Sequence, residues 1–155
     1  MFETIVWATD GSEPANHALE HVRELAEPHG SRIVAVHANE LIRGRAGGAP
    51  VLADEPDIRK RLELQVAELR AADFDATLDV RSGSRSVATL VEQAATDVDA
   101  DLIVVGTHGR GGVTAALMGS VARALCHAAT RPVLVVPPAG KSERTRKEAD
   151  HMVTA

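Results

Sequence analysis

The sequence contains very few aromatic residues and only one cysteine. Aromatic side chains make up 2% of the 155 residues, which leaves few platforms on which nucleic-acid bases stack. The formal net charge of -5 gives no excess of positive charge to hold a phosphodiester backbone. With Cys126 alone, no internal disulfide is possible, which is typical of a reducing compartment. We therefore expect a cytoplasmic protein whose main partner is not nucleic acid.

The sequence also lacks a basic leader and any apolar run long enough to span a bilayer. We therefore expect a soluble, unprocessed protein without a membrane partner. Three motifs of enzymes and cofactor-binding folds are absent as well. They are the G-x-S-x-G elbow of hydrolases, the G-x4-G-K-S/T phosphate loop, and a G-x-G-x-x-G after the first expected strand.

Strand-length apolar runs alternate with helix-period segments along the whole chain. This alternation is typical of βαβ units that build a parallel sheet, and the 45% hydrophobic content supports one sizeable core. The expected strands cover Thr4–Thr9, Arg32–Ala38, Ala76–Val80, Asp101–Val105 and Pro132–Val136. We expect one domain over residues 1–138, followed by a charged tail over 139–155 that is disordered or a short surface helix.

The segments between these strands predict four helices. They cover Pro14–Glu27, Asp57–Ala72, a segment from Val87 that Ser84 or Ser86 caps, and Ala115–Ala129. Ser12 is the expected cap of the first helix, and Pro28-His29-Gly30 ends that helix. The stretch Gly44–Pro56 is rich in glycine and proline and predicts a mobile loop.

Glycines cluster directly after the fourth expected strand. Residues 106–112 read Gly-Thr-His-Gly-Arg-Gly-Gly, and Gly119-Ser120 follow within the next helical pattern. Glycines let several backbone N–H groups converge on one anion, and a helix that begins beyond them adds its own free N–H groups. The Ser120 hydroxyl can donate a hydrogen bond to a phosphate oxygen, and Arg110 or His108 can offset part of the phosphate charge. No metal cage is visible, so Mg²⁺ would arrive with the nucleotide.

Asp10 and Gly106 follow or end the first and fourth strands. In a doubly wound sheet, ligands bind beyond the carboxyl ends of the strands, where the strand order reverses. The sequence therefore predicts a phosphate site in a crevice that these two residues flank.

The spacing Gly106-x2-Gly109-x9-Gly119-Ser120 resembles the G-2x-G-9x-G(S/T) signature of ATP-binding universal stress proteins. Ala8-Thr9-Asp10-Gly11-Ser12 and the runs 101–106 and 132–136 fit the same family in order and spacing. The resemblance covers about Met1 to Pro137. It implies a Rossmann-like α/β fold of the adenine nucleotide alpha hydrolase type, a five-stranded parallel sheet between helices with strand order 3-2-1-4-5.

The resemblance also implies a function, a set of site residues and a homodimer. The function is that of an ATP-binding, nucleotide-dependent regulator in stress response. The implied nucleotide contacts are Ala8, Asp10, Ala38, Gly106, His108, Gly109, Arg110, Gly119, Ser120 and Val121. Family members pair through the last strand, here Val133–Val136, with a twofold mate. Trp7 stands where the family usually has an aliphatic residue, and Ala8 where it often has proline or valine.

Several residues allow a plainer interpretation. Asp10 caps the first helix, contacts the ligand, or does both. His37 lies in a strand pattern, so we interpret it as a core histidine rather than a ligand. Cys126 is interpreted as a small buried or half-buried group in a helix.

Two other functions stay open at this point. One is a weak hydrolase or phosphotransferase in which Asp10, His108 and Ser120 converge across the crevice. The other is a nucleotide-free dimer that binds a protein partner. The sequence shows neither an evident general base aimed at water nor a paired-carboxylate metal site, so we expect ATP binding with hydrolysis absent or slow. The preference among ATP, AMP and a cyclic nucleotide is not decided by these residues.

Overall fold

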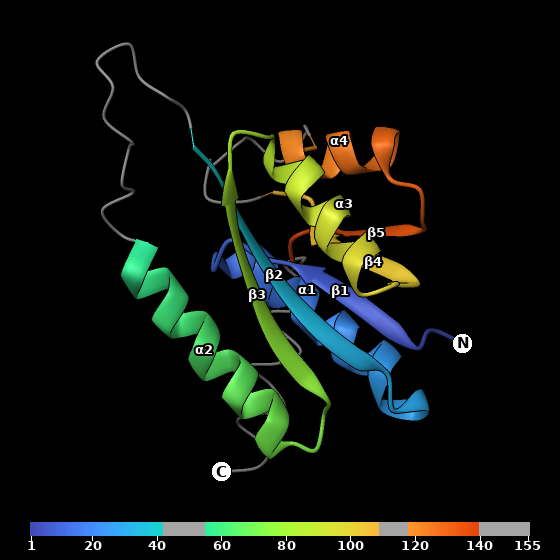
Figure 1. Cartoon of the computed structure of the whole chain (residues 1–155). Coiled ribbons are helices and arrows are strands. Elements are labelled where there is room, and N and C mark those ends of the chain that lie inside the picture. The colour runs from blue at the N-terminus through green and yellow to red at the C-terminus, as the bar shows by residue number, and fades with distance from the viewer. Residues whose placement is uncertain (42–54, 109–117, 140–155) are drawn as a thin grey trace.

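The computed structural model describes residues 1–41, 55–108 and 118–139, in which strands and helices alternate (Figure 1). In chain order the elements are β1 (Thr4–Ala8), α1 (Glu13–Ala26), the 3₁₀ turn η1 (Glu27–His29), β2 (Arg32–Glu40), α2 (Glu55–Ala71), β3 (Ala76–Gly83), α3 (Val87–Asp97), β4 (Leu102–Gly106), α4 (Ser120–Ala128) and β5 (Val133–Val136). No helix in these ranges is long and apolar enough to cross a membrane.

The five strands form one parallel sheet in the order β3-β2-β1-β4-β5, which confirms the predicted fold class. The central strand β1 pairs on both sides, so that Ile5 lies beside Ile33 of β2 and Leu102 of β4. Since the chain builds outward from β1 in both directions, the strand order reverses between β1 and β4.

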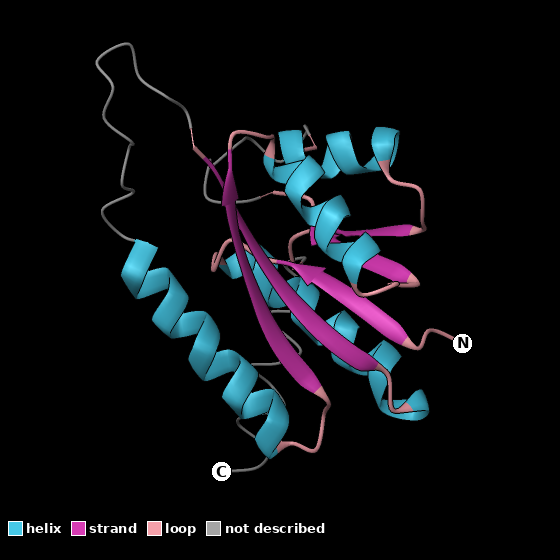
Figure 2. Ribbon diagram, viewed as in Figure 1, coloured by secondary structure: helices cyan, strands magenta, loops and turns pink. Residues whose placement is uncertain are grey.

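Helices cover both faces of the sheet (Figure 2). One core cluster joins α1 and α2 to the sheet and includes Ile5 and Trp7, while the other joins α3 and α4 and includes Val6 and Ala8. Successive residues of β1 therefore face opposite layers, as the twofold repeat of a strand requires. A central strand buried on both faces needs apolar residues throughout, which explains the continuous run in β4.

The first helix begins much as the sequence predicts, but its cap differs. Ser12 occupies the cap position without a side-chain cap bond, and Pro14 lies in the first turn. Instead, the Asp10 carboxylate Oδ1 accepts a hydrogen bond from the Ser12 N–H at 3.0 Å. At the other end the chain tightens into η1 and leaves through Gly30 with φ of 61°.

Two strands run further than the apolar pattern indicates. β2 continues to Glu40 and β3 to Gly83, and their ladder pairs Ala38 with Arg81 and Glu40 with Gly83. Polar side chains occur in both extensions, so the twofold apolar repeat fades there. The backbone pairing, which does not depend on side-chain type, continues.

Three helix boundaries also refine the predictions. α2 already includes Pro56, which a first helical turn tolerates, so the predicted loop is shorter than Gly44–Pro56. Ser86, not Ser84, caps α3 by accepting the Thr89 N–H at 3.3 Å. α4 begins at Ser120 and not at Ala115, because Gly119 is its cap residue. The rest of the predicted loop (44–54), residues 115–117 and the tail from 140 lie outside the described residues.

Candidate nucleotide site

A partly open cavity of about 260 Å³ lies at the carboxyl ends of β1 and β4, where the strand order reverses. This is where ligands bind in open parallel sheets. The described residues that line it are Ala8, Thr9, Asp10, Ala15, Val36, Ala38, Val87, Val91, Val105, Gly106, Thr107, His108, Gly119, Ser120, Val121 and Ala122.

The turn after β1 places Asp10 at the cavity. The Thr9 N–H donates to the Val36 carbonyl at 2.9 Å, which extends the sheet by one residue. The Thr9 hydroxyl then accepts the Gly11 N–H at 3.1 Å, and the Asp10 carboxylate accepts the Ser12 N–H. The carboxylate of Asp10 therefore holds the turn into α1 while it lines the cavity, so both interpretations of this residue are compatible.

The opposite wall is formed by the end of β4 and the start of α4. The Gly119 N–H donates to the Thr107 carbonyl at 2.8 Å, so the chain just before residues 109–117 contacts the chain just after them. A Cβ on Gly119 would lie 3.0 Å from that carbonyl oxygen, which is closer than side chains normally approach backbone. Glycine at this position therefore lets α4 begin against the sheet and bring Ser120 to the cavity.

Asp10 and His108 carry the ionisable side chains among the described lining residues, and none of these residues is Lys or Arg. The Nε2 atom of His108 is buried and has no hydrogen-bond partner among the described residues. A buried polar atom without a partner is costly, so this nitrogen is suited to a hydrogen bond with a ligand. In the part of the chain that the structure describes, no three His, Cys, Asp or Glu side chains gather as a metal site.

The remaining wall is apolar. Val36 and Ala38 of β2 share one face with two-residue spacing, and Val87 and Val91 of α3 lie one turn apart. Together with Val105 they form a surface without charge. The cavity therefore combines an apolar lining with a small number of polar side chains, among them Asp10, His108 and Ser120, the combination that small-molecule sites commonly show.

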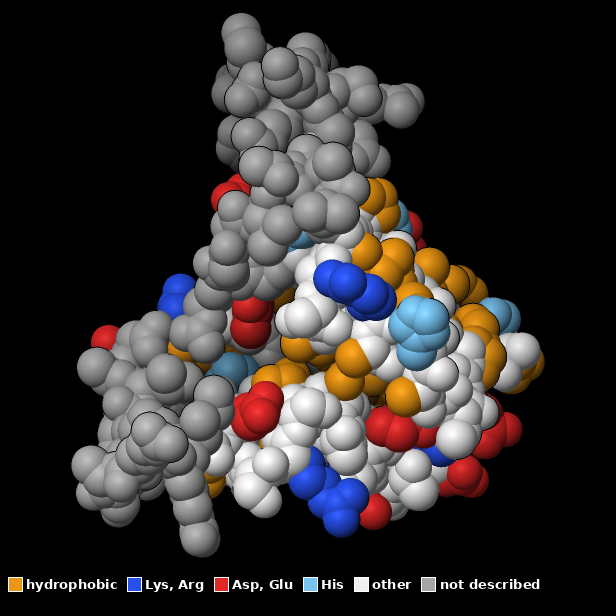
Figure 3. Space-filling model, turned by 90° about the horizontal axis from the view of Figure 1, so that it is seen from above, with side chains coloured by type: hydrophobic (Ala, Val, Ile, Leu, Met, Phe, Trp, Pro, Cys, Tyr) orange, Lys and Arg blue, Asp and Glu red, His pale blue; other side chains and the backbone are white. Residues whose placement is uncertain are grey.

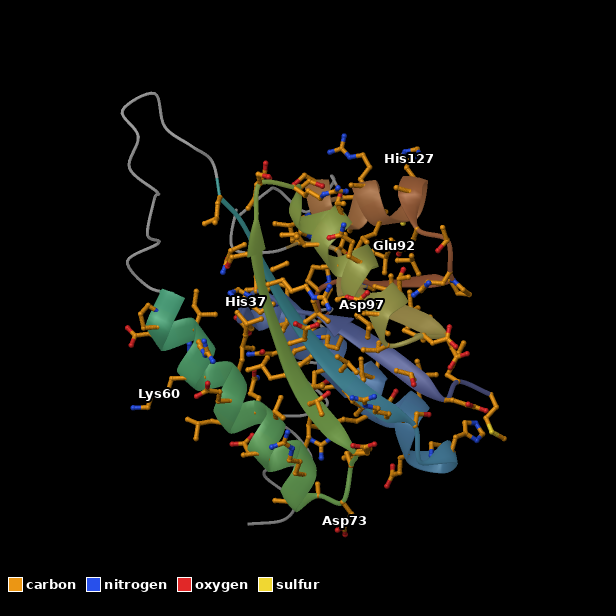
Figure 4. The ribbon with its side chains drawn as sticks, in the orientation of Figure 1. His37, Lys60, Asp73, Glu92, Asp97 and His127 are labelled. Carbon is orange, nitrogen blue, oxygen red and sulfur yellow. The ribbon has the colours of Figure 1, made fainter. Side chains whose placement is uncertain are left out.

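Two prominent residues near the cavity face away from it. Trp7 is fully buried in the α1 and α2 layer, and its Nε1 donates to the Ala15 carbonyl at 3.0 Å. His37 is 1% exposed, and its Nδ1 lies 2.9 Å from the Thr9 carbonyl oxygen, which confirms a core histidine (Figure 4). Alternation along β1 and β2 thus directs the smaller Ala8 and Ala38 to the cavity.

The structure brings most of the predicted contact residues to this one cavity. They are Ala8, Asp10, Ala38, Gly106, His108, Gly119, Ser120 and Val121. Gly109 and Arg110 lie outside the described residues. Cys126 is exposed, contrary to the predicted buried or half-buried position. α4 buries Ala122 and Leu125, and Cys126 follows Leu125 by about 100° around the helix axis.

Sequence reasoning did not assign the apolar wall or Thr107 to the site. Val36 was recognisable from its two-residue spacing to Ala38, and Val87 and Val91 from their spacing of about one turn at the start of the predicted third helix. Thr107 lies inside the glycine-rich motif, but nothing in the sequence shows that its carbonyl meets Gly119.

In the view from above, charges of both signs are scattered among hydrophobic side chains on the described surface (Figure 3).

Comparisons with known proteins agree with this architecture. The model of the universal stress protein family matches residues 1–137. A universal stress protein of Thermus aquaticus is 35% identical over 140 residues, which cover 88% of this chain and 99% of that protein. A universal stress protein of Mycobacterium tuberculosis strain H37Rv is 35% identical over 131 residues, but these cover 81% of this chain and 42% of that protein.

Solved structures show the same fold. A universal stress protein family member from Burkholderia pseudomallei has a TM-score of 0.71 and 30% identity, with 88% of this chain and 96% of that chain covered. A universal stress protein from Archaeoglobus fulgidus in complex with dAMP has a TM-score of 0.65 and 23% identity, over 88% of this chain and 98% of that one. A further universal stress protein structure, in complex with cAMP, has a TM-score of 0.61 and 22% identity, over 89% of this chain and 98% of that one. With its family match, its relatives and its sheet order in agreement, this chain belongs to the universal stress protein family.

Proposed function

We propose that the cavity binds ATP and that the protein acts as a nucleotide-dependent regulator in stress response, with hydrolysis absent or slow. One observation carries the proposal. Residues at the ends of β1, β2 and β4 converge with residues of α1, α3 and the start of α4 on one cavity at the reversal of strand order. The structures solved with dAMP and cAMP support an adenine nucleotide as the class of ligand.

The described residues fit such a ligand on two independent grounds. The buried Nε2 of His108 lacks a partner among them, and Gly119 keeps the start of α4 free of a Cβ. The apolar wall suits a base, whereas the first turn of α4 with Ser120 suits phosphate oxygens, since helix N-termini present free N–H groups. Because the described residues contain no metal cluster, we propose Mg²⁺ only as a companion of the triphosphate.

The cavity volume of about 260 Å³ lies slightly below the ~300–1,000 Å³ common for small-molecule sites. We infer that the cavity encloses the nucleoside and that the phosphates extend along its open side. We also propose a cytoplasmic location, because the one cysteine, Cys126, is an exposed free thiol, a state that persists in a reducing compartment.

The test is direct. Purified protein is denatured, its extract is chromatographed for nucleotides, and ATP is titrated calorimetrically into three proteins. These are wild type, the double variant Gly119→Ala/Ser120→Ala, and the matched control Gly83→Ala/Ser84→Ala. Gly83 and Ser84 form the same dipeptide at the end of β3, outside the cavity, and a Cβ on Gly83 meets ordinary contact at 3.4 Å.

We expect wild type and the control to bind ATP, and the double variant at Gly119 and Ser120 to bind at least tenfold more weakly, a loss of about 1.4 kcal/mol. The physical reason is that a Cβ at position 119 displaces the first turn of α4, while alanine in place of Ser120 lacks the hydroxyl. A wild-type protein that neither retains nor titrates any adenine nucleotide would falsify the proposal. It would favour a partner-binding dimer that keeps only the fold.

We further propose a homodimer through β5. Among the described residues, no strand pairs with the outer side of β3 or of β5, and these two edges differ in charge. β3 carries Asp79 and Arg81, whose ion pair has a distance of 2.7 Å and extends to Asp97 at 2.8 Å. The hydrogen bond that Arg81 donates to the Asp79 carboxylate, together with the one to Asp97, raises the pKa of the Arg81 guanidinium. Charged side chains protect an edge against pairing with another chain.

β5 has no such protection. It consists of Val133, Leu134, Val135 and Val136, and the first three are only half-buried. The carbonyls of Pro132 and Val136 accept N–H groups from β4 and from the residue directly after it, so the backbone groups of Val133 and Val135 point to the open edge. An aliphatic edge strand whose outward backbone groups bond to no described residue is suited to antiparallel pairing with a second copy.

A further inference from the structure

We propose that Thr107 couples nucleotide occupancy of the cavity to pairing of β5 with a second copy of this chain. This inference rests on the proposed function and adds a mode of regulation to it. Thr107 lines the cavity, and both its N–H and its side-chain hydroxyl bond directly to the edge strand β5.

The contacts of Thr107 with β5 are doubled. Its N–H donates to the Val136 carbonyl at 2.7 Å, and its hydroxyl donates to the same oxygen at 2.8 Å. The N–H bond continues the parallel ladder in which Gly106 lies beside Val136. The hydroxyl bond is an addition to the backbone pattern of that ladder. Both lone pairs of the Val136 carbonyl are therefore directed at one residue.

On its other side, Thr107 holds the start of α4. Its carbonyl accepts the Gly119 N–H at 2.8 Å, and the Gly119 carbonyl accepts the Arg123 N–H at 3.0 Å as the first bond of the helix. A ligand that binds at Ser120 and the first turn of α4 therefore acts on Gly119. A Cβ at position 119 would lie only 3.0 Å from the Thr107 carbonyl oxygen, so the backbones of Thr107 and Gly119 are in close contact. A displacement of Gly119 is therefore passed on to Thr107.

At the edge, Val136 is the anchor of β5. It is 3% exposed, whereas the other three residues of the strand are half-buried and pack against both core clusters. A shift of Thr107 thus reaches the buried end of a strand whose outer side is open. The path from ligand to interface consists of Gly119, Thr107 and Val136, joined by backbone and hydroxyl hydrogen bonds of 2.8 Å or less.

Coupling between two sites is reciprocal. If ATP strengthens dimerisation by some factor, the dimer binds ATP more tightly than the monomer by a factor derived from the same free energy. We expect ATP to lower the dimer dissociation constant of wild type about tenfold, within the range of ~5 to 150 typical of allosteric coupling.

The experiment measures the dimer dissociation constant by sedimentation, with and without saturating ATP. The variants are Thr107→Val, which keeps the shape and removes the hydroxyl bond, and Thr107→Ser, which restores the hydroxyl. The matched control is Thr77→Val in β3, at the other edge of the sheet. We expect about tenfold tightening by ATP in wild type, Thr107→Ser and Thr77→Val, and about threefold or less in Thr107→Val, with ATP titrated to saturation for each protein separately.

Each result decides between defined outcomes. Equal tightening in Thr107→Val and wild type overturns the role of Thr107, and no tightening in wild type overturns the coupling. If the wild-type protein binds ATP but stays monomeric, this inference is wrong and the proposed ATP binding stands. If the wild-type protein binds no ATP, the proposed function is wrong as well. If Thr107→Val does not fold, Val135→Pro replaces it. This monomeric variant should bind ATP about threefold more weakly than each site of the wild-type dimer, because the two ATP sites of a dimer share the tenfold change, and equal affinity overturns the coupling.

Discussion

Asp101 joins the starts of two neighbouring strands. Its carboxylate oxygen Oδ2 accepts the N–H groups of Glu3 at 2.7 Å and Thr4 at 2.9 Å, just before β1 and at its first residue. The Asp101 N–H in turn donates to the Thr4 carbonyl at 2.9 Å, just ahead of β4. The bonds from Thr4 and then Glu3 lower the pKa of Asp101 below its usual value of 3.8.

These bonds predict a pH-dependent contribution to stability. A carboxylate whose pKa is lowered by folding stabilises the native state above its usual pKa, and this contribution disappears as pH falls through the lowered value. Because Asp101 is exposed and solvent screens its charge, we expect Asp101→Asn to reduce the free energy of unfolding by about 1 kcal/mol or less at neutral pH, with a difference from wild type that shrinks as the pH falls below 3.8 and through the lowered pKa. Urea denaturation across this range measures it.

Asp99 provides the matched control, because it is an aspartate close by in the same loop. Asp99→Asn should not reproduce the pH profile. A difference between Asp101→Asn and wild type that persists undiminished in acid would mean that the charge of Asp101 is not what stabilises the two strands.

At the scale of elements, a small polar cluster ties α3 to the connection between α4 and β5. Glu92 of α3 accepts the Thr130 hydroxyl at 2.6 Å and the Thr130 N–H at 3.1 Å through Oε1. Arg131 lies 3.9 Å from the same oxygen, with its Nε and Nη1 buried and without hydrogen-bond partners among the described residues. The side chains of Glu92 and Arg131 are 19% and 15% exposed, so solvent compensates them only in part.

Removal of the charge at Glu92 should therefore be costly. We expect Glu92→Gln to lower the free energy of unfolding by about 2 kcal/mol, less than the ~3–5 kcal/mol seen for fully buried pairs. The matched control is Glu63→Gln in the exposed Arg59–Glu63 pair of α2, which should cost about 0.5 kcal/mol or less. Chemical denaturation compares the two, and equal losses would show that the cluster does not hold the elements together.

The type and position of a helix or strand were predictable where a single residue pattern determines them. The residues at which the elements begin and end were not. The continuous apolar run of β4 and the apolar stripe of α3 indicated both type and place, because burial on two faces or one requires those patterns. The extensions of β2 and β3 were missed because backbone pairing continues past the apolar residues. The start of α4 was placed too early, because helical spacing alone does not reveal that Gly119 bonds to Thr107.

The candidate site was predictable for the same reason and within the same limits. Gly106, Gly119 and Ser120, which line the cavity, were predictable as candidate residues, since close backbone approach to an anion would need those residue types. The direction of Trp7 was not, because either face of a doubly covered strand accepts a bulky residue. Its burial against α1, with Nε1 bonded to the Ala15 carbonyl, depends on packing between elements distant from the motif.

For the whole molecule, the unequal edges of the sheet predict which one pairs. Val135 and Val80 occupy equivalent positions, since their backbone groups point away from the neighbouring strand at the β5 and β3 edges. The Ile33 and Leu41 N–H groups bond to the Asp75 and Gly83 carbonyls, which sets this alternation in β3. Proline is tolerated on edge strands where its missing N–H faced solvent, so both proline variants should keep the fold.

Val135→Pro removes a donor from the proposed dimer edge, and we expect it to be monomeric, while Val80→Pro stays dimeric. Because dimerisation stabilises by mass action, the Tm of wild type and Val80→Pro should rise by about 4 °C for a hundredfold increase in protein concentration. The Tm of Val135→Pro should not change with concentration. Sedimentation and thermal scans at matched concentrations check both. If instead Val80→Pro alone becomes monomeric, the molecule pairs through β3, and the ion pairs of Asp79, Arg81 and Asp97 would then belong to the interface.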